Sequence, residues 1–177
     1  MTMPASTDET YVVLLGGALV ATPRLAHDIA GARFIAADGG MRHAAMLGVT
    51  PDLWVGDFDS TPPELLAAWP DVERQPYPAA KNETDGALAV SVATGRGARS
   101  VLLAGALGGE RSDHALMHLL HAVSLAEAGI AIKLTSGEEE AWPLLPGRRE
   151  IDLPAGSLFS VLGLTALSGL HLENVRY

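Results

Sequence analysis

The 177-residue sequence contains no cysteine. Disulfide bonds and metal sites built on thiolates are therefore excluded, and the lack of disulfides fits a protein of a reducing compartment. Residues 1–9 are polar and show no basic segment followed by an apolar core, which a secretory signal peptide would need. These absences together predict a cytoplasmic protein.

Positive charge is scarce as well. Twelve Lys and Arg residues stand against 21 Asp and Glu, which gives a net charge of −9 and no basic run. A broad nucleic-acid surface is therefore not expected. No apolar run is long enough to span a membrane. The sequence also lacks both G-x-x-x-x-G-K-[ST] and G-x-G-x-x-G, which disfavours a P-loop kinase or a dinucleotide oxidoreductase.

Short apolar, β-rich segments alternate with helical segments over the first three quarters of the chain. Strands are expected at 11–15, 33–37, 53–55, 72–77 and 100–104, and helices at 23–30, 41–47, 65–69, 85–94 and 113–128. Repeated strand-helix units imply right-handed crossovers between parallel strands. The first part of the chain is thus predicted to be an α/β fold, a mostly parallel sheet with helices on both faces.

The pattern changes after Gly129, where short strands separated by glycine and proline turns become the rule. They are expected at 131–134, 141–145, 150–153, 158–162 and 170–175. Such spacing is typical of all-β structure. We therefore predict two domains, an α/β domain at 10–133 and a smaller all-β, sandwich-like unit at 134–177.

Two aspartates follow the strand that ends near Val55 and Gly56. On an extended segment, residues i and i+2 point the same way, so Asp57 and Asp59 would aim both carboxylates at one point. Like charges that close need a cation between them, and Mg²⁺ carrying substrate phosphates suits such oxygen ligands. The alternative is an acidic turn in which one aspartate caps the helix that follows Pro62.

Three further polar clusters also follow expected strands. The four clusters are 38–40, 57–59, 81–85 and 111–113. Ligands of open α/β sheets bind beyond the carboxyl ends of the strands, so these clusters are expected to share one edge. Five carboxylates and two cations would then converge there: Asp38, Asp57, Asp59, Asp85 and Asp113 with Lys81 and Arg111. Metal-assisted phosphoryl transfer needs this combination.

Other readings of these residues remain open. Gly39-Gly40 and Gly108-Gly109 would let backbone approach a ligand closely, or would simply form turns. Lys81 and Arg111 could instead be solvated surface charges.

The order and spacing of these motifs resemble thiamine pyrophosphokinase over about residues 11–130. The matching elements are Ala37-Asp38-Gly39-Gly40, Gly56-Asp57-Phe58-Asp59-Ser60, Lys81-x-x-Thr84-Asp85, Gly105-x-x-Gly108-Gly109 and Arg111-x-Asp113-His114. The resemblance implies an α/β catalytic domain followed by a β-sandwich, in a homodimer whose thiamine site includes the partner's sandwich. It also implies Mg²⁺-dependent transfer of pyrophosphate from ATP to the hydroxyethyl group of thiamine.

The resemblance assigns roles to the residues that match. By it, Mg²⁺ is held by Asp57, Asp59 and Asp85. The nucleotide is bound by Asp38, Gly39, Gly40, Lys81, Thr84, Gly108 and Arg111. Asp113 lies near the reacting hydroxyl or orients the cations, and the catalytic set is Asp57, Asp59, Asp85, Arg111 and Asp113.

The sequence departs from the family pattern at several positions. Asn82 replaces an acidic residue, Gly86 a hydroxyl residue and His118 an asparagine, while Glu110 is an extra residue before Arg111. The strands expected after Leu170, with their thiamine loop, are missing, so we expect a shortened thiamine-binding unit.

Two alternatives remain. Asp57-x-Asp59-x-Thr61 also satisfies the pattern of haloacid-dehalogenase-like phosphatases, with Asp57 as nucleophile and Asp59 as acid and base. That reading leaves the clusters at 38–40 and 111–113 unexplained. The other alternative is a module that binds a nucleotide without turnover.

Overall fold

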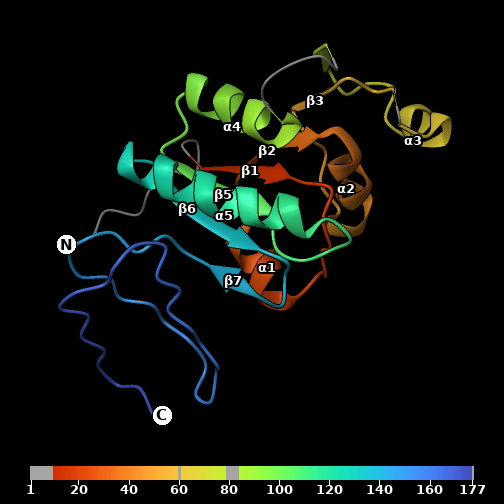
Figure 1. The fold of residues 1–177 in the computed structure, drawn as a ribbon. Helices are drawn as coiled ribbons and strands as arrows, with labels where there is room; N and C mark the ends of the chain where they lie inside the picture. The colour runs from red at the N-terminus through yellow and green to blue at the C-terminus, as the bar shows by residue number, and fades with distance from the viewer. Residues whose placement is uncertain (1–9, 60, 79–83, 177) are drawn as a thin grey trace. The chain divides into compact units, whose positions relative to one another are not determined.

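The computed structural model describes residues 10–59, 61–78 and 84–176 (Figure 1). Its internal contacts divide the chain into two units, Met1–Pro146 and Gly147–Tyr177. Within the described ranges, none of the helices has the length and hydrophobicity needed to cross a membrane.

A seven-stranded sheet forms the centre of the first unit. Its strands are β1 (Thr10–Leu14), β2 (Arg33–Ala37), β3 (Leu53–Gly56), β4 (Arg74–Pro76), β5 (Ser100–Ala104), β6 (Ala131–Thr135) and β7 (Glu140–Ala141). They lie in the order β4-β3-β2-β1-β5-β6-β7, and every neighbouring pair is parallel except β6 and β7. The predicted, mostly parallel α/β sheet is therefore confirmed.

Helices cover both faces of this sheet. They are α1 (Pro23–Asp28), η2 (Asp38–Met41, a 3-10 turn), α2 (Arg42–Leu47), α3 (Pro63–Ala68), α4 (Asp85–Gly95) and α5 (Ser112–Glu127). Tyr11 and Val13 of β1 belong to the core that includes buried residues of α4 and α5, whereas Val12 and Leu14 belong to the core with α1 and α2. Burial on both faces explains why the central strands are apolar throughout.

The order of the strands determines where a ligand can bind. The chain goes from β1 to β2, β3 and β4 on one side, and then returns to place β5 on the other side of β1. Loops that leave β1 and β5 therefore turn in opposite directions, which opens a crevice beyond their carboxyl ends. The fold thus marks the loops after β1 and β5 as the centre of a candidate site.

The predicted domain boundary at residue 134 falls inside β6. β6 pairs with β5, and β7 extends the same sheet, so both strands belong to the first unit. Charges reinforce this placement, because Lys133 of β6 pairs with Asp28 of α1 at 2.6 Å and also with Glu140 of β7. Burial favours the neutral form of Glu140, but hydrogen bonds from Arg24 and Lys133 outweigh that effect and lower the pKa of the carboxyl.

The internal contacts of the chain divide it after Pro146 rather than at residue 134.

The later strands differ from their prediction. The strand expected at 141–145 is confined to Glu140–Ala141. Those expected at 150–153, 158–162 and 170–175 are not formed, since residues 147–176 contain neither helix nor strand. An alternating apolar pattern yields a strand only where a neighbour supplies the ladder hydrogen bonds, and short unpaired segments do not form one alone.

Candidate active site

The described residues of the four polar clusters follow parallel strands and lie at the carboxyl edge of the sheet. Asp38 follows β2, Asp57 follows β3, Asp85 begins α4 after β4, and Arg111 precedes α5 after β5. Since β2 to β5 are parallel members of one sheet, these loops share one edge. Lys81, the second predicted cation, lies outside the described residues, as does Ser60.

Asp38 begins the turn after β2 in an unusual backbone conformation. Its φ is +42°, which a non-glycine residue adopts only where surrounding contacts hold it. Trp54 Nε1 donates to the carbonyl oxygen of Asp38 at 2.9 Å, and Thr61 Oγ1 donates to its Oδ1 at 3.3 Å. The loop after β3 thus orients the Asp38 carboxylate.

The two aspartates after β3 lie on a turn, so their predicted extended geometry is wrong. β3 ends at Gly56, and Phe58 has a φ of +60°. The ring of Phe58 packs edge-on against Trp54 with 5.3 Å between ring centroids, and the Asp59 N–H donates to Asp57 Oδ1 at 3.2 Å. Phe58 therefore stands in a left-handed turn, and its half-buried ring packs on Trp54.

The alternative that these aspartates cap the next helix is also wrong. The residue at the N-cap of α3 is Pro62, and no side chain makes the capping hydrogen bond. Neither Asp57 nor Asp59 therefore stabilises α3 in the way that the acidic-turn reading requires.

The third predicted metal ligand stands at the first position of α4. Thr84 Oγ1 accepts from Ala87 N at 3.2 Å and caps this helix, which places Asp85 in its first turn. Among the described residues, no three His, Asp or Glu side chains are close enough to hold a metal ion together. Mg²⁺ usually takes only one or two protein carboxylates and completes its shell with water and phosphate oxygens. The donor chemistry of Asp57, Asp59 and Asp85 fits that ion.

Arg111 and Asp113 form a paired unit before and within the first turn of α5. Arg111 Nε and Nη2 donate to the two carboxylate oxygens of Asp113 at 2.9 and 2.7 Å. These hydrogen bonds hold the pKa of the Asp113 carboxyl far below its usual range and raise the pKa of the guanidinium. A carboxylate with such a low pKa is a poor proton acceptor, so the geometry suits Asp113 as a residue that orients Arg111.

Close backbone packing explains two of the edge glycines. A Cβ on Gly40 would lie 2.1 Å from the carbonyl oxygen of Leu14, and one on Gly17 would lie 2.3 Å from that of Gly105. Gly108 and Gly109 have φ values of +73° and +99°, which favour glycine. Gly40 therefore allows the β2 loop to touch β1, whereas a Cβ on Gly39 would meet only Arg42, at 3.9 Å.

Sequence reasoning missed the loop after β1 and the residues that hold it. Arg42 Nη2 donates to the carbonyl oxygens of Gly16 and Gly17, the latter at 3.2 Å, and His43 Nε2 lies 2.9 Å from Gly17 O. Burial lowers the pKa of His43, which keeps it neutral beside Arg42. The available signal was the position of Gly16-Gly17 at the end of a central strand.

Two departures from the family pattern lie against each other in the structure. A Cβ on Gly86 of α4 would lie 3.1 Å from Cε1 of His118 on α5, and 2.8 Å from Cδ2 of Leu15. The imidazole of His118 therefore occupies space that a side chain at position 86 would need. Glycine and histidine at these positions form a matched pair.

We expect Gly86→Ser to destabilise the protein by about 1–3 kcal/mol, because the new side chain overpacks this contact. Combining it with His118→Asn should recover part of that loss, with a coupling of about 1 kcal/mol or more. Urea unfolding of the two single variants and the double variant measures the coupling. Gly95→Ser is the control, since a Cβ there meets nothing within 4 Å. Strictly additive effects would show that the two positions are independent.

His118 also predicts how stability depends on pH. Burial, together with the nearby charges of His114 and His121, lowers the pKa of His118 from 6.5 to about 4. Between these values the unfolded chain binds more protons at this residue than the folded chain does, so the free energy of unfolding falls as the pH drops from 6.5 towards 4. His118→Asn should make this dependence shallower in urea unfolding across the window. Identical slopes for His118→Asn and the parent protein would refute the assignment.

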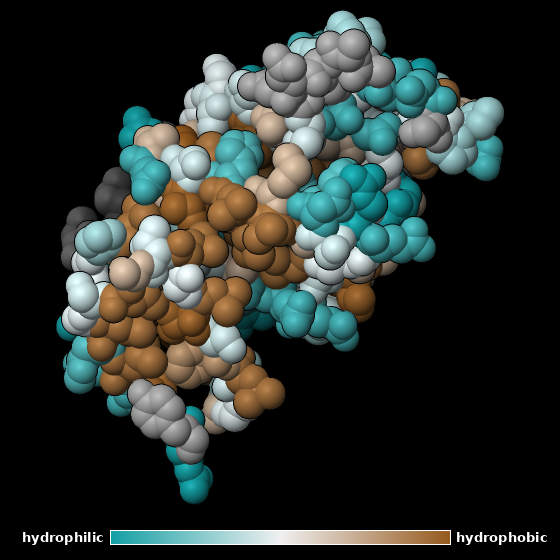
Figure 2. All heavy atoms as spheres, in the orientation of Figure 1, coloured by the Kyte–Doolittle hydropathy of each residue, from teal (hydrophilic) through white to brown (hydrophobic). Residues whose placement is uncertain are grey.

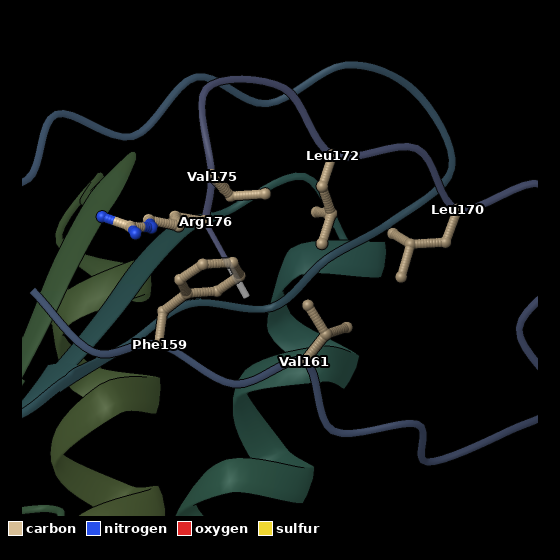
Figure 3. A pocket seen from close by; sticks show the side chains of 6 residues that line it. All are labelled: Phe159, Val161, Leu170, Leu172, Val175 and Arg176. Carbon is tan, nitrogen blue, oxygen red and sulfur yellow. The ribbon is translucent and has the colours of Figure 1, made fainter.

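A hollow in the second unit contains none of the predicted site residues. It measures about 310 Å³ and is lined by Phe159, Val161, Leu170, Leu172, Val175 and Arg176 (Figure 3). Figure 3 shows the apolar side chains facing a common space, and all six come from residues 147–177. The polar edge of the sheet is therefore the better candidate for phosphate chemistry.

Solved structures share this fold. The crystal structure of thiamin pyrophosphokinase from Geobacillus thermodenitrificans is 29% identical with a TM-score of 0.58, covering 71% of this chain and 58% of that one. The enzyme from Bacillus subtilis is 26% identical with a TM-score of 0.57, covering 71% and 60%. Yeast thiamin pyrophosphokinase is 13% identical with a TM-score of 0.58, covering 74% and 59%, and shows the fold alone. The chain thus spans about three-fifths of the length of these structures.

A match to a family model identifies the group of proteins. No curated protein matches the chain significantly. Residues 30–134 match the model described as the catalytic domain of thiamin pyrophosphokinase, and this stretch contains all four polar clusters. The match displaces the phosphatase alternative, which left two of those clusters unexplained. Because it covers more than half of the sequence, the chain belongs to the thiamin pyrophosphokinase family.

Proposed function

We propose that this chain binds ATP with Mg²⁺ and transfers its pyrophosphoryl group to thiamine. A bond forms between the hydroxyethyl oxygen of thiamine and the β-phosphorus of ATP. The bond from that phosphorus to the oxygen bridging the α-phosphorus breaks, the hydroxyl proton is released, and AMP leaves. The observation that carries the proposal is the gathering of the Asp38, Asp57, Asp85 and Arg111 clusters at one carboxyl edge of the parallel sheet.

Carboxylates and cations have separate roles in this proposal. We assign Mg²⁺ to the carboxylates Asp57, Asp59 and Asp85, of which one or two would hold the ion, and the bound ion would neutralise charge on phosphate oxygens. Asp38, Gly39 and Gly40, with Thr84 and Gly108, would line the nucleotide site. Asp38 is itself oriented by Thr61, so its carboxylate is positioned before a ligand arrives.

Arg111 would stabilise charge on the phosphates that react, together with Lys81. Its bidentate contact with Asp113 orients the plane of the guanidinium. Transfer of this kind depends on positioning and charge neutralisation more than on a strong base. That requirement agrees with the lowered pKa of Asp113.

The first experiment measures AMP release from ATP and Mg²⁺ by chromatography, with and without thiamine. We expect AMP and thiamine diphosphate to appear together, and neither to form without thiamine. ADP or inorganic phosphate formed at the same rate without thiamine would contradict the proposal and indicate a phosphatase.

A second candidate is a nucleotide-binding module without turnover. The absence of helix and strand in residues 147–176 favours it, because an unformed second unit leaves less structure to hold an acceptor. Calorimetric binding of Mg·ATP without thiamine-dependent AMP release would establish this candidate instead.

A homodimer is also part of the proposal. Leu116, Met117 and Leu120 of α5 are 53%, 48% and 46% exposed, and Figure 2 shows hydrophobic surface over this helix. Exposed apolar clusters of this kind mark interaction sites. Light scattering coupled to gel filtration should give the mass of a dimer, and Leu120→Glu should lower it to that of a monomer. A monomeric parent protein would refute the dimer.

A further inference from the structure

Arg42 is a cation at the centre of the carboxyl edge to which the motifs assign no role. Its Nη2 donates to the carbonyl oxygens of Gly16 and Gly17, in the loop after β1. Its Nη1 lies 3.9 Å from where a Cβ of Gly39 would stand, in the turn after β2. The guanidinium therefore lies over the ends of two neighbouring central strands, and the hydrogen bonds hold it there.

The contacts of Arg42 leave its charge uncompensated. Carbonyl oxygens accept hydrogen bonds but carry no net charge, and in the part of the chain that the structure describes no carboxylate pairs with this arginine. By contrast, Arg111 pairs with Asp113 and Arg24 pairs with Glu140. An exposed, unpaired guanidinium is notable in a protein with a net charge of −9.

Arg42 also keeps donors available for a ligand. Nη2 makes both of the observed hydrogen bonds, so the three N–H groups on Nε and Nη1 have no partner among the described residues. A guanidinium presents such donors in a planar fork that fits two oxygens of a phosphate. Because two carbonyls already restrict the side chain, binding an anion costs less conformational entropy than it would for a mobile arginine.

We propose that Arg42 binds the polyphosphate of the nucleotide, as a further cation beside Arg111 at this edge. The inference rests on the proposed function, since it requires that a nucleotide polyphosphate binds across the loops after β1 and β2. It assigns Arg42 a binding role, with Gly16 and Gly17 as the groups that position it.

Calorimetric titration with Mg·ATP and with AMP, both without thiamine, tests the proposal. The proteins are the parent chain, Arg42→Met, Arg42→Gln and Arg96→Met. Glutamine removes the charge but retains an amide that can donate to the Gly16 and Gly17 carbonyls, so it tests the charge if the methionine variant is unstable. Arg96 is the control, an exposed arginine at the far end of α4.

We expect both Arg42 variants to bind Mg·ATP about 10- to 100-fold more weakly, the range for losing hydrogen bonds to a charged group. Affinity for AMP should fall less, so the ratio of ATP to AMP affinity decreases, and the melting temperature of Arg42→Gln should stay close to that of the parent. Arg96→Met should bind both nucleotides normally.

Three outcomes would overturn the proposal in distinguishable ways. Unchanged Mg·ATP affinity in Arg42→Gln would refute the role of Arg42 while the proposed function stands. Equal loss of ATP and AMP affinity would show that Arg42 only supports the loop after β1. A parent chain that binds neither nucleotide would remove the proposed function and this inference together.

Discussion

Asp57→Asn is expected to lower the rate of thiamine-dependent AMP formation by about 10³-fold, the scale seen when a group that stabilises transition-state charge is removed. The asparagine retains an oxygen at the position of Asp57 Oδ1, so the hydrogen bond from the Asp59 N–H can persist. The charge that would attract Mg²⁺ is lost. The measurement is kcat for AMP release at saturating ATP and thiamine over a series of Mg²⁺ concentrations.

The fold should tolerate this change. Replacing one of two neighbouring carboxylates removes a like-charge repulsion, so the melting temperature of the apo protein should stay the same or rise slightly. Asp52→Asn is the matched control, because Asp52 lies just before the opposite end of β3, where it accepts from Phe34 N at 3.2 Å. It should retain activity. An Asp57→Asn variant that turns over as fast as the parent would mean that Asp57 holds no catalytic metal.

Gly40→Ala is expected to lower the free energy of unfolding by about 3 kcal/mol or more, at the upper end of overpacking effects. The added Cβ would lie 2.1 Å from Leu14 O and 2.5 Å from Leu14 C, which are backbone atoms in the central strand of the sheet. These atoms cannot rotate away, so the turn after β2 or the end of β1 must shift. Urea unfolding measures the loss.

Gly95→Ala is expected to change the free energy of unfolding in the opposite direction. Gly95 is the last residue of α4, and a Cβ there meets nothing within 4 Å. Alanine should stabilise this helix by up to about 1 kcal/mol, since it loses less conformational entropy than glycine. If Gly40→Ala proved as stable as the parent protein, the close approach of the β2 loop to β1 would not be a constraint on the fold.

Local patterns in the sequence were sufficient for the first unit. Uninterrupted apolar runs such as 100–104 specify strands buried on both faces, and glycines such as Gly48 and Gly129 end the helices before them. The alternation of these elements specifies parallel pairing, and parallel pairing alone brings the four polar clusters to one edge. Each step depends on residues that are near in sequence, which is why it could be predicted.

Local sequence patterns gave wrong predictions where the structure of a segment depends on a neighbouring segment of the chain. Residues 158–162 have a strand-like pattern but form no strand, because a strand also requires hydrogen bonds from a neighbour that sequence does not reveal. The sequence predicts an extended segment for Asp57 and Asp59, but Phe58 lies in the left-handed region and its ring packs on Trp54. The periodicity of apolar residues in the sequence does not predict a contact of this kind.

The sequence by itself therefore determined the α/β architecture, the family and the edge at which the polar residues gather. Only the tertiary structure decided which side chains and backbone groups contact one another at this edge. It showed that Gly40 serves close packing against β1, that His118 occupies the space beside Gly86, and that Arg42 lies over the loop after β1. The physical reason is range: secondary structure follows from local spacing, whereas these contacts join segments far apart in the chain whose approach depends on the packing of the whole unit.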